Sequence, residues 1–331
     1  MAGTPGAFTT DHIPTSILYT EIMDSIERHN EANRDWKSMF CGPSVTRKST
    51  VEMRERGMTM EESGQDTTQP DMQHIPRQTI NLNSPRRWLL NASITHKAWE
   101  EGMNSTEIRE DHLEALDADY RTVTESVLEE ALTDGGWYSG TVIPPRFKRS
   151  TFLVTHDHYL AANVGGIPLL SHFTESYQHI TEHGYPGSLI VAFINGQQSE
   201  QIVNYTEWGT APGPMPTPVM TRLQELGHYP AFMAAGIPVY REDWIPDNYM
   251  LLVCLNPRMW PMKWRVPEQP DPAVEGLMAY TMEAHDFDMS VKYRYIEEYA
   301  RWTSATIVRQ GAGVAYYLGG ANYVSPGGWY A

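Results

Sequence analysis

The segment from Asn104 to Asp134 constrains the fold most, because its pattern predicts one uninterrupted amphipathic helix. Asn104 suits the N-cap, Glu107 stands at the capping-box position, and Gly135-Gly136 predicts the end of the helix. At about 1.5 Å per residue the helix would be roughly 45 Å long. One apolar stripe follows it, formed by Ile108, Leu116, Tyr120, Val123, Val127 and Leu132.

This helix is also strongly acidic, with ten acidic residues against Arg109 and Arg121. We interpret the acids, Glu110, Glu114 and Asp117 among them, as a solvated face or one that meets a basic partner. Paired catalytic carboxylates or calcium ligands are the alternative. The whole chain of 331 residues carries a net charge of −16. It therefore lacks the basic character of a protein that binds duplex DNA directly.

An unusual region, Ser44 to Asn83, precedes the helix. Two stretches suited to β-strands, Val45–Met53 and His74–Asn83, flank a polar segment, Glu55–Asp71, and few residues there could anchor a core. An isolated hairpin is marginally stable in water. We therefore predict a long hairpin that packs on another chain; a disordered loop is the alternative.

The first strand of this hairpin is basic. No aromatic residue lies between Val45 and Met72, so base stacking on single-stranded nucleic acid is not favoured. An acidic protein surface is a better partner, and a second copy of the long helix supplies one. The basic residues that would make this contact are Arg47, Lys48, Arg54 and Arg56.

The rest of the chain predicts mixed α and β structure. A helix is expected over Thr15–Phe40, ended by Gly42-Pro43, and no signal peptide precedes it. No apolar run approaches the roughly 18 to 20 residues of a membrane helix, and Cys41 and Cys254 are expected to be free thiols. Later elements are expected as strands at Phe152–Val154, Ser188–Asn195, Ile237–Tyr240 and Tyr249–Leu255, helices at Ser171–His183 and Pro218–Leu226, and a Pro-rich loop at Pro212–Pro218.

Four histidines form the strongest candidate for chemistry. His156 and His158 would share one side of a strand, and His179 and His183 one face of a helix. Four such nitrogens could hold zinc or iron. The second Asp-His of a metallo-hydrolase motif is missing, however, so we interpret them as polar side chains near a strand end and on an exposed helix. We predict no bound metal or other cofactor.

Motifs of catalysis and nucleotide binding are also missing. The sequence has no Gly-x-Ser-x-Gly, no Gly-x-Gly-x-x-Gly and no Walker loop. Gly311-Ala312-Gly313 lacks the third glycine and is interpreted as a strand where backbones approach closely. We therefore predict a protein that is not an enzyme and has no catalytic residues.

The order of parts resembles the Hong Kong 97-type capsid subunit of tailed bacteriophages: an N-terminal helical arm, a long charged hairpin, a long acidic helix, a mixed α/β region and closing strands. Local motifs add to the likeness, most closely to capsid proteins of actinobacterial phages. These motifs are Thr155–Leu160, Ser171–Tyr185 with its Thr181-Glu182-His183-Gly184-Tyr185, Trp244-Ile245-Pro246-Asp247-Asn248-Tyr249, and Arg309–Val314. The likeness covers residues 85–331 by motif and the first 84 by position alone.

The resemblance implies an α+β fold with an N-arm, an E-loop, a P-domain with a spine helix and β-sheet, and an A-domain. A large N-terminal scaffolding domain, which some members have, is not seen. Some members also cross-link an E-loop Lys to a P-domain Asn, for which Lys48 and Asn322 lie in loosely suitable regions. The implied division is 1–43 for the N-arm, 44–100 for the E-loop region, 101–160 for the P-domain with its spine at about 104–134, 161–270 for the A-domain and 271–331 for the returning P-domain strands.

The implied function is that of a structural subunit assembling as pentamers and hexamers into an icosahedral shell around phage DNA. E-loops would lie over neighbouring spine helices, and N-arms would reach across to other subunits. Expected partners are further copies, scaffold, portal and decoration proteins, with no sequence-specific DNA contact and no membrane; assembly would take place in the host cytoplasm. An encapsulin-type shell protein and a His-ligated metalloenzyme are the alternatives. Candidate aromatic anchors are Trp88, Trp99, Trp260 and Trp264.

Overall fold

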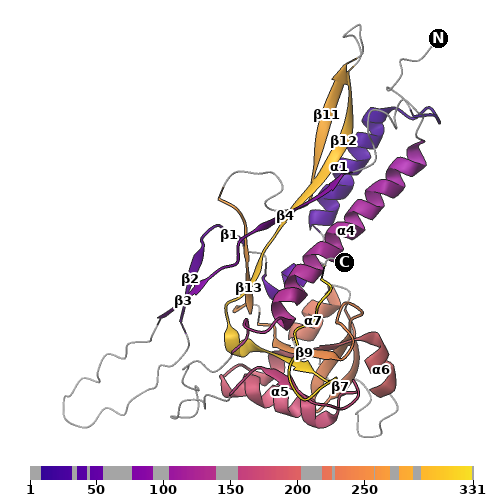
Figure 1. Cartoon of the computed structure of the whole chain (residues 1–331). Coiled ribbons are helices and arrows are strands. Elements are labelled where there is room, and N and C mark those ends of the chain that lie inside the picture. The colour runs from indigo at the N-terminus through magenta and orange to yellow at the C-terminus, as the bar shows by residue number, and fades with distance from the viewer. Residues whose placement is uncertain are drawn as a thin grey trace.

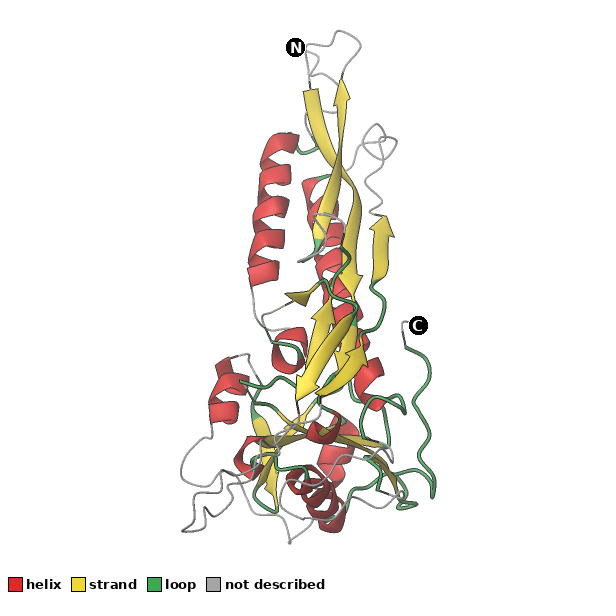
Figure 2. Cartoon of the chain, turned by 90° about the vertical axis from the view of Figure 1, so that its left-hand side faces the viewer, coloured by secondary structure: helices red, strands yellow, loops and turns green. Residues whose placement is uncertain are grey.

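The molecule is long and narrow, with a compact body at one end and an arm of helices and strands extending from it (Figure 1, Figure 2). It is a computed structural model, and it combines helices with several mixed sheets. The residues that the structure describes are 9–31, 36–42, 45–54, 77–91, 104–138, 156–202, 218–225, 228–256, 258–268, 276–285 and 292–329.

The long helix is confirmed as α4 (Ser105–Leu132), which runs from the tip of the arm into the body (Figure 1). Its capping box is formed: the Glu107 amide donates to Asn104 Oδ1 at 2.8 Å, and the Asn104 amide donates to Glu107 Oε2 at 3.3 Å. After the helix the chain is held by Tyr159, whose hydroxyl donates to the Thr133 carbonyl and accepts from the amides of Gly136 and Trp137.

A six-stranded mixed sheet forms the centre of the body. The strand order is β5 (Tyr159–Ala161), β14 (Gly313–Tyr317), β9 (Tyr249–Cys254), β6 (Ile190–Ile194), β8 (Ile237–Arg241) and β7 (Pro230–Ala234). The pairs β5–β14 and β6–β8 are parallel, and the pairs β14–β9, β9–β6 and β8–β7 are antiparallel.

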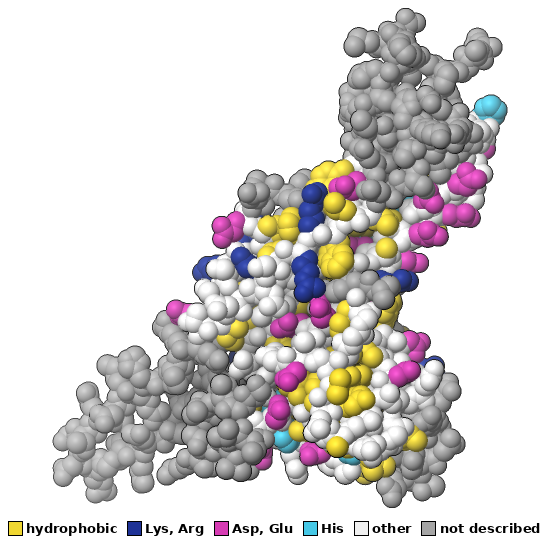
Figure 3. All heavy atoms as spheres, viewed as in Figure 1, with side chains coloured by type: hydrophobic (Ala, Val, Ile, Leu, Met, Phe, Trp, Pro, Cys, Tyr) yellow, Lys and Arg dark blue, Asp and Glu magenta, His cyan; other side chains and the backbone are white. Residues whose placement is uncertain are grey.

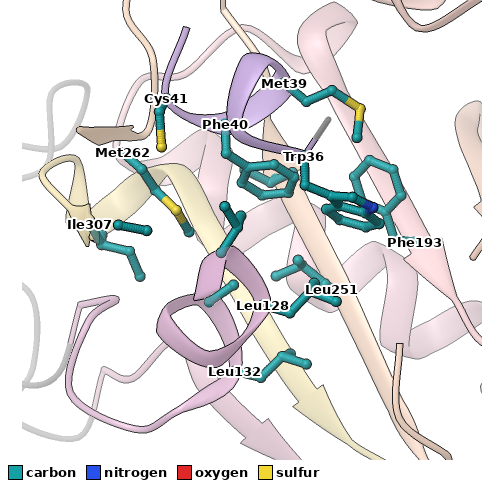
Figure 4. Close-up of a cluster of buried hydrophobic side chains, with 14 of the residues drawn as sticks. Trp36, Met39, Phe40, Cys41, Leu128, Leu132, Phe193, Leu251, Met262 and Ile307 are labelled. Atoms are coloured by element: carbon teal, nitrogen blue, oxygen red, sulfur yellow. The ribbon is translucent and has the colours of Figure 1, made fainter. Parts of the chain in front are cut away.

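Both faces of this sheet are buried, which explains the uninterrupted apolar runs of β6 and β9. Phe193 and Leu251 face one core, where they meet α2 (Trp36–Phe40) and the C-terminal turns of α4 (Figure 4). Their sequence neighbours Ala192 and Leu252 face the other core, under α5 (Leu170–Glu182). Alternation along a strand sends successive side chains to opposite faces, so the sheet needs a cover on each side.

A second sheet carries the arm. It has the order β11 (Met278–His285), β12 (Lys292–Thr303) and β4 (Arg86–Asn91), all antiparallel. The N-terminal helix α1 (Thr15–Glu31) packs between this sheet and α4. The residues that meet in this third core include Leu18, Ile22, Ile26, Ile108, Leu277 and Tyr299.

The position of α1 and α2 corrects two expectations. The single helix predicted over Thr15–Phe40 is described as two separate helices. The N-terminal segment was also expected to reach across to neighbouring subunits, whereas its apolar side chains are buried in their own chain. The physical reason is the apolar spacing of α1, whose side chains pack against both α4 and β12 of the same subunit.

The basic hairpin begins beside the body and leaves it. β1 (Val45–Thr46) pairs with β10 (Met262–Arg265), which pairs in turn with β13 (Ala305–Ile307). β2 (Thr50–Arg54) and β3 (Arg77–Asn81) then pair antiparallel over five residue pairs, from Thr50–Asn81 to Arg54–Arg77. The predicted two-stranded base is thus confirmed, and the expected polar segment Glu55–Asp71 lies outside the described residues.

The remaining elements agree with most of the sequence predictions. Strands β6, β8 and β9 and helix α5 lie within one or two residues of their expected bounds, as does α7 (Pro218–Glu225). The short helices α6 (Gly196–Ile202) and the 3-10 turn Gly187–Leu189 were not predicted. Phe152–Val154 and most of Pro212–Pro218 lie outside the described residues. Both cysteines are buried thiols that form no disulfide, as expected.

The strand predicted at Gly311-Ala312-Gly313 is confirmed only for Gly313, which begins β14. Gly311 lies in a 3-10 turn, Gln310–Ala312, and the rings of His183 and Trp137 fill the space beside Gly311 and Gly313 where a Cβ would project. The glycines therefore admit side-chain rings, not a neighbouring backbone. Strand β14, expected among the closing strands, pairs with β9 and β5 in the six-stranded sheet.

Candidate assembly surfaces and a histidine cluster

The basic residues of the hairpin are exposed where the structure describes them. Arg47 and Lys48 precede β2, and the Arg47 guanidinium lies 3.5 Å from the Glu268 carbonyl oxygen. The side chain of Arg54 and the whole of Arg56 lie outside the described residues. Arg47 and Lys48 are thus available to a partner, and no contact with α4 of the same chain is recorded for them.

The outward face of α4, defined here as Glu110, Leu113, Glu114 and Asp117, is exposed and acidic. Figure 3 shows acidic side chains gathered along the edge where the N-terminal part of α4 runs. Leu113 is 59% exposed among these acids. The spacing of three and four residues places the four side chains on one side of the helix, so they form a continuous strip with one apolar position.

Other acids of α4 turn inward, which the sequence analysis missed. Asp119 receives two hydrogen bonds from the Arg301 guanidinium of β12, at 2.6 and 2.7 Å, and its Oδ2 lies 2.8 Å from His29 Nε2 of α1. Burial alone would raise the Asp119 pKa, but Arg301 and His29 hold it below its ordinary value. The sequence carried a signal: Asp119 falls on the apolar stripe between Leu116 and Val123.

Glu130 is a second inward acid and behaves oppositely. Burial raises its pKa, although the Ile307 amide and the Asn83 side chain both donate to the carboxylate at 2.8 Å and act against that rise. Glu130 therefore joins the end of α4 to β13 and to the segment after β3. Only part of the acidic excess of the helix is available to a partner.

The four candidate tryptophans have different environments. Trp264 is 1% exposed and belongs to the subunit's own core, so its assignment to an interface is wrong. Trp260 is half-buried beside Gly42, and Trp88 is half-buried with its indole donating to Thr303 Oγ1 at 2.7 Å. Trp99 lies outside the described residues.

Exposed apolar side chains of β4 are stronger candidates for contact than those tryptophans. Leu89 and Leu90 are 52% and 39% exposed. Figure 3 shows apolar and basic side chains side by side on the middle of the viewed face. Arg86 and Arg87 precede these leucines on the strand, and they pair with Glu129 at 3.1 Å and Glu298 at 3.7 Å.

Three of the four candidate histidines converge. His156 and His158 lie just before β5, and His183 follows α5; their Nε2 atoms are 3.1 to 3.2 Å apart. His158 lies next to a strand end, as the sequence indicated, and its side chain is fully buried. Burial and the neighbouring histidines lower the pKa of His158 well below its usual range and that of His183 to about 3. His179 stacks on His156 with ring centroids 4.6 Å apart.

No described helix is long and apolar enough to cross a membrane. No protein-family model matches the sequence, and no curated protein matches it either.

Solved structures do resemble this chain. A structure from Mycobacterium phage Patience is 18% identical and has a TM-score of 0.63, with 97% of this chain and 93% of that chain covered. The capsid structure of cyanophage P-SCSP1u is 10% identical with a TM-score of 0.49, covering 83% of this chain and 85% of that chain. A virus-like particle from Pyrococcus furiosus is 8% identical with a TM-score of 0.46, covering 90% and 98%.

The likeness to the Patience structure extends over nearly all of both chains, so the fold is shared as a whole and not through one domain. The chain has the α+β Hong Kong 97-type fold, as its order of parts predicted.

Proposed function

We propose that this chain is the major capsid protein of a tailed bacteriophage, a structural subunit that assembles with many further copies into the shell of the virion. The observation that carries the proposal is the Hong Kong 97-type fold over 97% of the chain. In this proposal the hairpin β2–β3 is the E-loop, α4 is the spine helix of the P-domain, and the six-stranded sheet with α5 is the A-domain. Pentamers and hexamers would form through A-domain contacts.

Two exposed surfaces of opposite charge support self-assembly. Arg47 and Lys48 of the basic hairpin are exposed, while the outward face of α4 carries three exposed acids and Leu113. Complementary charges steer association and fix register. Many modest contacts per subunit then give a stable shell through multivalency. The hairpin of one copy would therefore dock on α4 of the next.

The other partners follow from the same proposal. Scaffold and portal proteins would guide shell closure in the host cytoplasm, and decoration proteins could bind outside. The shell would enclose double-stranded DNA without reading its sequence. A net charge of −16 suits a container, because a strongly basic wall would hold the packaged DNA and release it poorly.

Expression of the full chain with the neighbouring phage genes should give closed shells or capsomers in negative-stain micrographs and in sedimentation. Complete particles should contain DNA. Particles that instead enclose a co-expressed enzyme would show an encapsulin-type compartment. A compact monomer under every condition, with the scaffold present, would contradict the proposal.

Reversing the hairpin charge tests the docking step. Replacing Arg47, Lys48, Arg54 and Arg56 together with Glu should abolish shells while the subunit stays folded, and partial variants should assemble with greater sensitivity to salt. Each exposed pair contributes only about 0.2 to 1 kcal/mol, so single changes should have little effect. Assembly is measured by light scattering and folding by circular dichroism.

The matched control restores the complementarity. Adding Glu110→Lys, Glu114→Lys and Asp117→Lys to the fourfold variant should recover shells, since opposite charges again face each other. Arg28→Glu with Arg258→Glu, two exposed charges elsewhere, should assemble normally. Normal particles from the fourfold variant would show that hairpin charge does not direct assembly.

A further inference from the structure

The Nε2 atoms of His156, His158 and His183 form a nearly equilateral triangle with sides of 3.2, 3.2 and 3.1 Å. Three nitrogens held this closely cannot all be hydrogen-bonded to one another. A ring nitrogen carries either a hydrogen or a lone pair, so at least two of the three are in the same state. That pair would face each other, two hydrogens or two lone pairs, with no bond between them.

The state of His158 is fixed by its other nitrogen. His158 Nδ1 lies 2.6 Å from the Gly313 carbonyl oxygen, which can only accept, so Nδ1 carries the hydrogen. The lone pair of the neutral ring is then on Nε2, directed into the triangle. A ligand histidine that donates its second N–H to a backbone carbonyl is the usual arrangement around bound metal ions.

The size of the triangle also fits a metal ion. Zinc binds imidazole nitrogen at about 2.0 to 2.1 Å, so two histidines of a tetrahedral site have nitrogens roughly 3.3 Å apart. The observed sides are within about 0.2 Å of that separation. A point roughly 0.9 Å out of the plane of the nitrogens lies about 2.05 Å from all three, which leaves a fourth position for water or another ligand.

The surrounding chain holds the three rings in place. The His158 amide donates to the Tyr138 carbonyl, and its carbonyl accepts from the Ala315 amide of β14. The His183 ring occupies the space beside Gly311, where any Cβ would collide with it. Tyr138 covers the cluster, with its ring centroid 5.0 Å from that of His183 and 5.3 Å from that of His156. Gly311 therefore leaves room for the His183 ring, and Gly313 holds His158 through its carbonyl oxygen.

Although no bound metal was expected from the sequence, we propose that His156, His158 and His183 bind one divalent transition-metal ion of the zinc class, which ties the segment before β5 to the residue after α5 as a structural site. Imidazole ligands suit zinc, and the three protein donors come from two segments separated by the whole of α5. The proposal is independent of the capsid function, since shells could form with or without the metal.

The test uses the purified full chain, stripped with a chelator, reloaded with zinc chloride and desalted. We expect about one zinc per chain by elemental analysis, a melting temperature that rises with zinc, and the visible absorption of four-coordinate cobalt when Co²⁺ replaces zinc. His156→Gln and His183→Gln should each weaken zinc binding at least about 100-fold, more than the loss of an outer partner, which costs about 10- to 100-fold.

Two further variants separate ligation from packing. His179→Gln removes a neighbouring histidine that stacks on His156 without belonging to the triangle, and it should retain zinc. Gly311→Ala keeps every histidine but displaces the His183 ring, and it should weaken binding. Less than about a tenth of a zinc per chain after reloading, with an unchanged melting temperature, would overturn the proposal. Full zinc retention by His156→Gln and His183→Gln together would overturn it as well.

Discussion

Asp119→Asn should destabilise the subunit by about 3 to 5 kcal/mol, because it leaves the buried Arg301 guanidinium without its counter-charge. The side chains of Asp119 and Arg301 are 1% and 8% exposed, so water cannot compensate for the lost carboxylate. The measurement is the free energy of urea-induced unfolding of the unassembled subunit. Glu114→Gln, on the exposed face of the same helix, should change that free energy very little.

A double variant shows whether the charge or the packing matters. Asp119→Leu with Arg301→Met removes both charges and should recover much of the stability, as apolar replacements of buried ion pairs often do. An Asp119→Asn subunit as stable as the unmodified chain would show that the pair contributes nothing. A double variant with a lower free energy of unfolding than Asp119→Asn would show that the hydrogen bonds between the two side chains, rather than their charges, stabilise the subunit.

The same pair gives a definite pH dependence. The folded-state pKa of Asp119 is below its ordinary value of 3.8, so the unfolded chain binds the proton more readily. The contribution to stability is complete above that ordinary value and is lost as pH falls through the folded pKa. The free energy of unfolding of Asp119→Asn should therefore fall less steeply at acid pH than that of the unmodified chain. At neutral pH the two curves should run parallel.

Trp36→Ala should cost about 3 to 5 kcal/mol of subunit stability, the usual range for deleting a large buried ring. Trp36 is fully buried in α2, with its ring centroid 5.5 Å from that of Phe40 and 5.2 Å from that of Phe193 (Figure 4). If α2 were part of an arm that only contacts a neighbouring subunit, Trp36→Ala would impair assembly and leave the free energy of unfolding of the subunit unchanged. The expected loss of unfolding free energy thus distinguishes a core element from an arm.

Leu113→Ala is the control for Trp36→Ala, since Leu113 is 59% exposed and its truncation should leave the unfolding transition unchanged. Trp36→Phe is a milder variant: it keeps an aromatic ring in the core and removes an indole N–H that has no hydrogen-bond partner within the described residues. It should cost less than Trp36→Ala. A Trp36→Ala subunit with full stability would contradict the placement of α2 in the core.

Local signals in the sequence predicted α4 and the strands of the body well. The capping box at Asn104 and Glu107 and the apolar stripe are short-range patterns, and they lie in α4 as expected. The continuous apolar runs of β6 and β9 indicated buried strands without showing which faces were covered. That information depends on α2 and α5, which come from distant parts of the chain.

Predictions that depended on pairing between distant residues failed more often. Asp119 looked like one more surface acid, because its partner Arg301 is 182 residues away. The histidines of β5 and α5 were recognised as pairs, but their convergence depends on Gly311 and Gly313 at the other end of the chain. The charge pattern of the hairpin and of α4 was evident in the sequence, and its role in docking remains a prediction.

The six-stranded sheet ends in two strands that are poorly suited to pairing with another molecule. β5 has only three residues, and β7 starts with Pro230 and has a register shift between Pro230 and Phe232. Short edges, proline and irregular register all reduce strand addition from outside. In the proposed shell, where many copies would lie close together, these edges would protect the protein from polymerising edge to edge into fibres, and association would be left to its other surfaces.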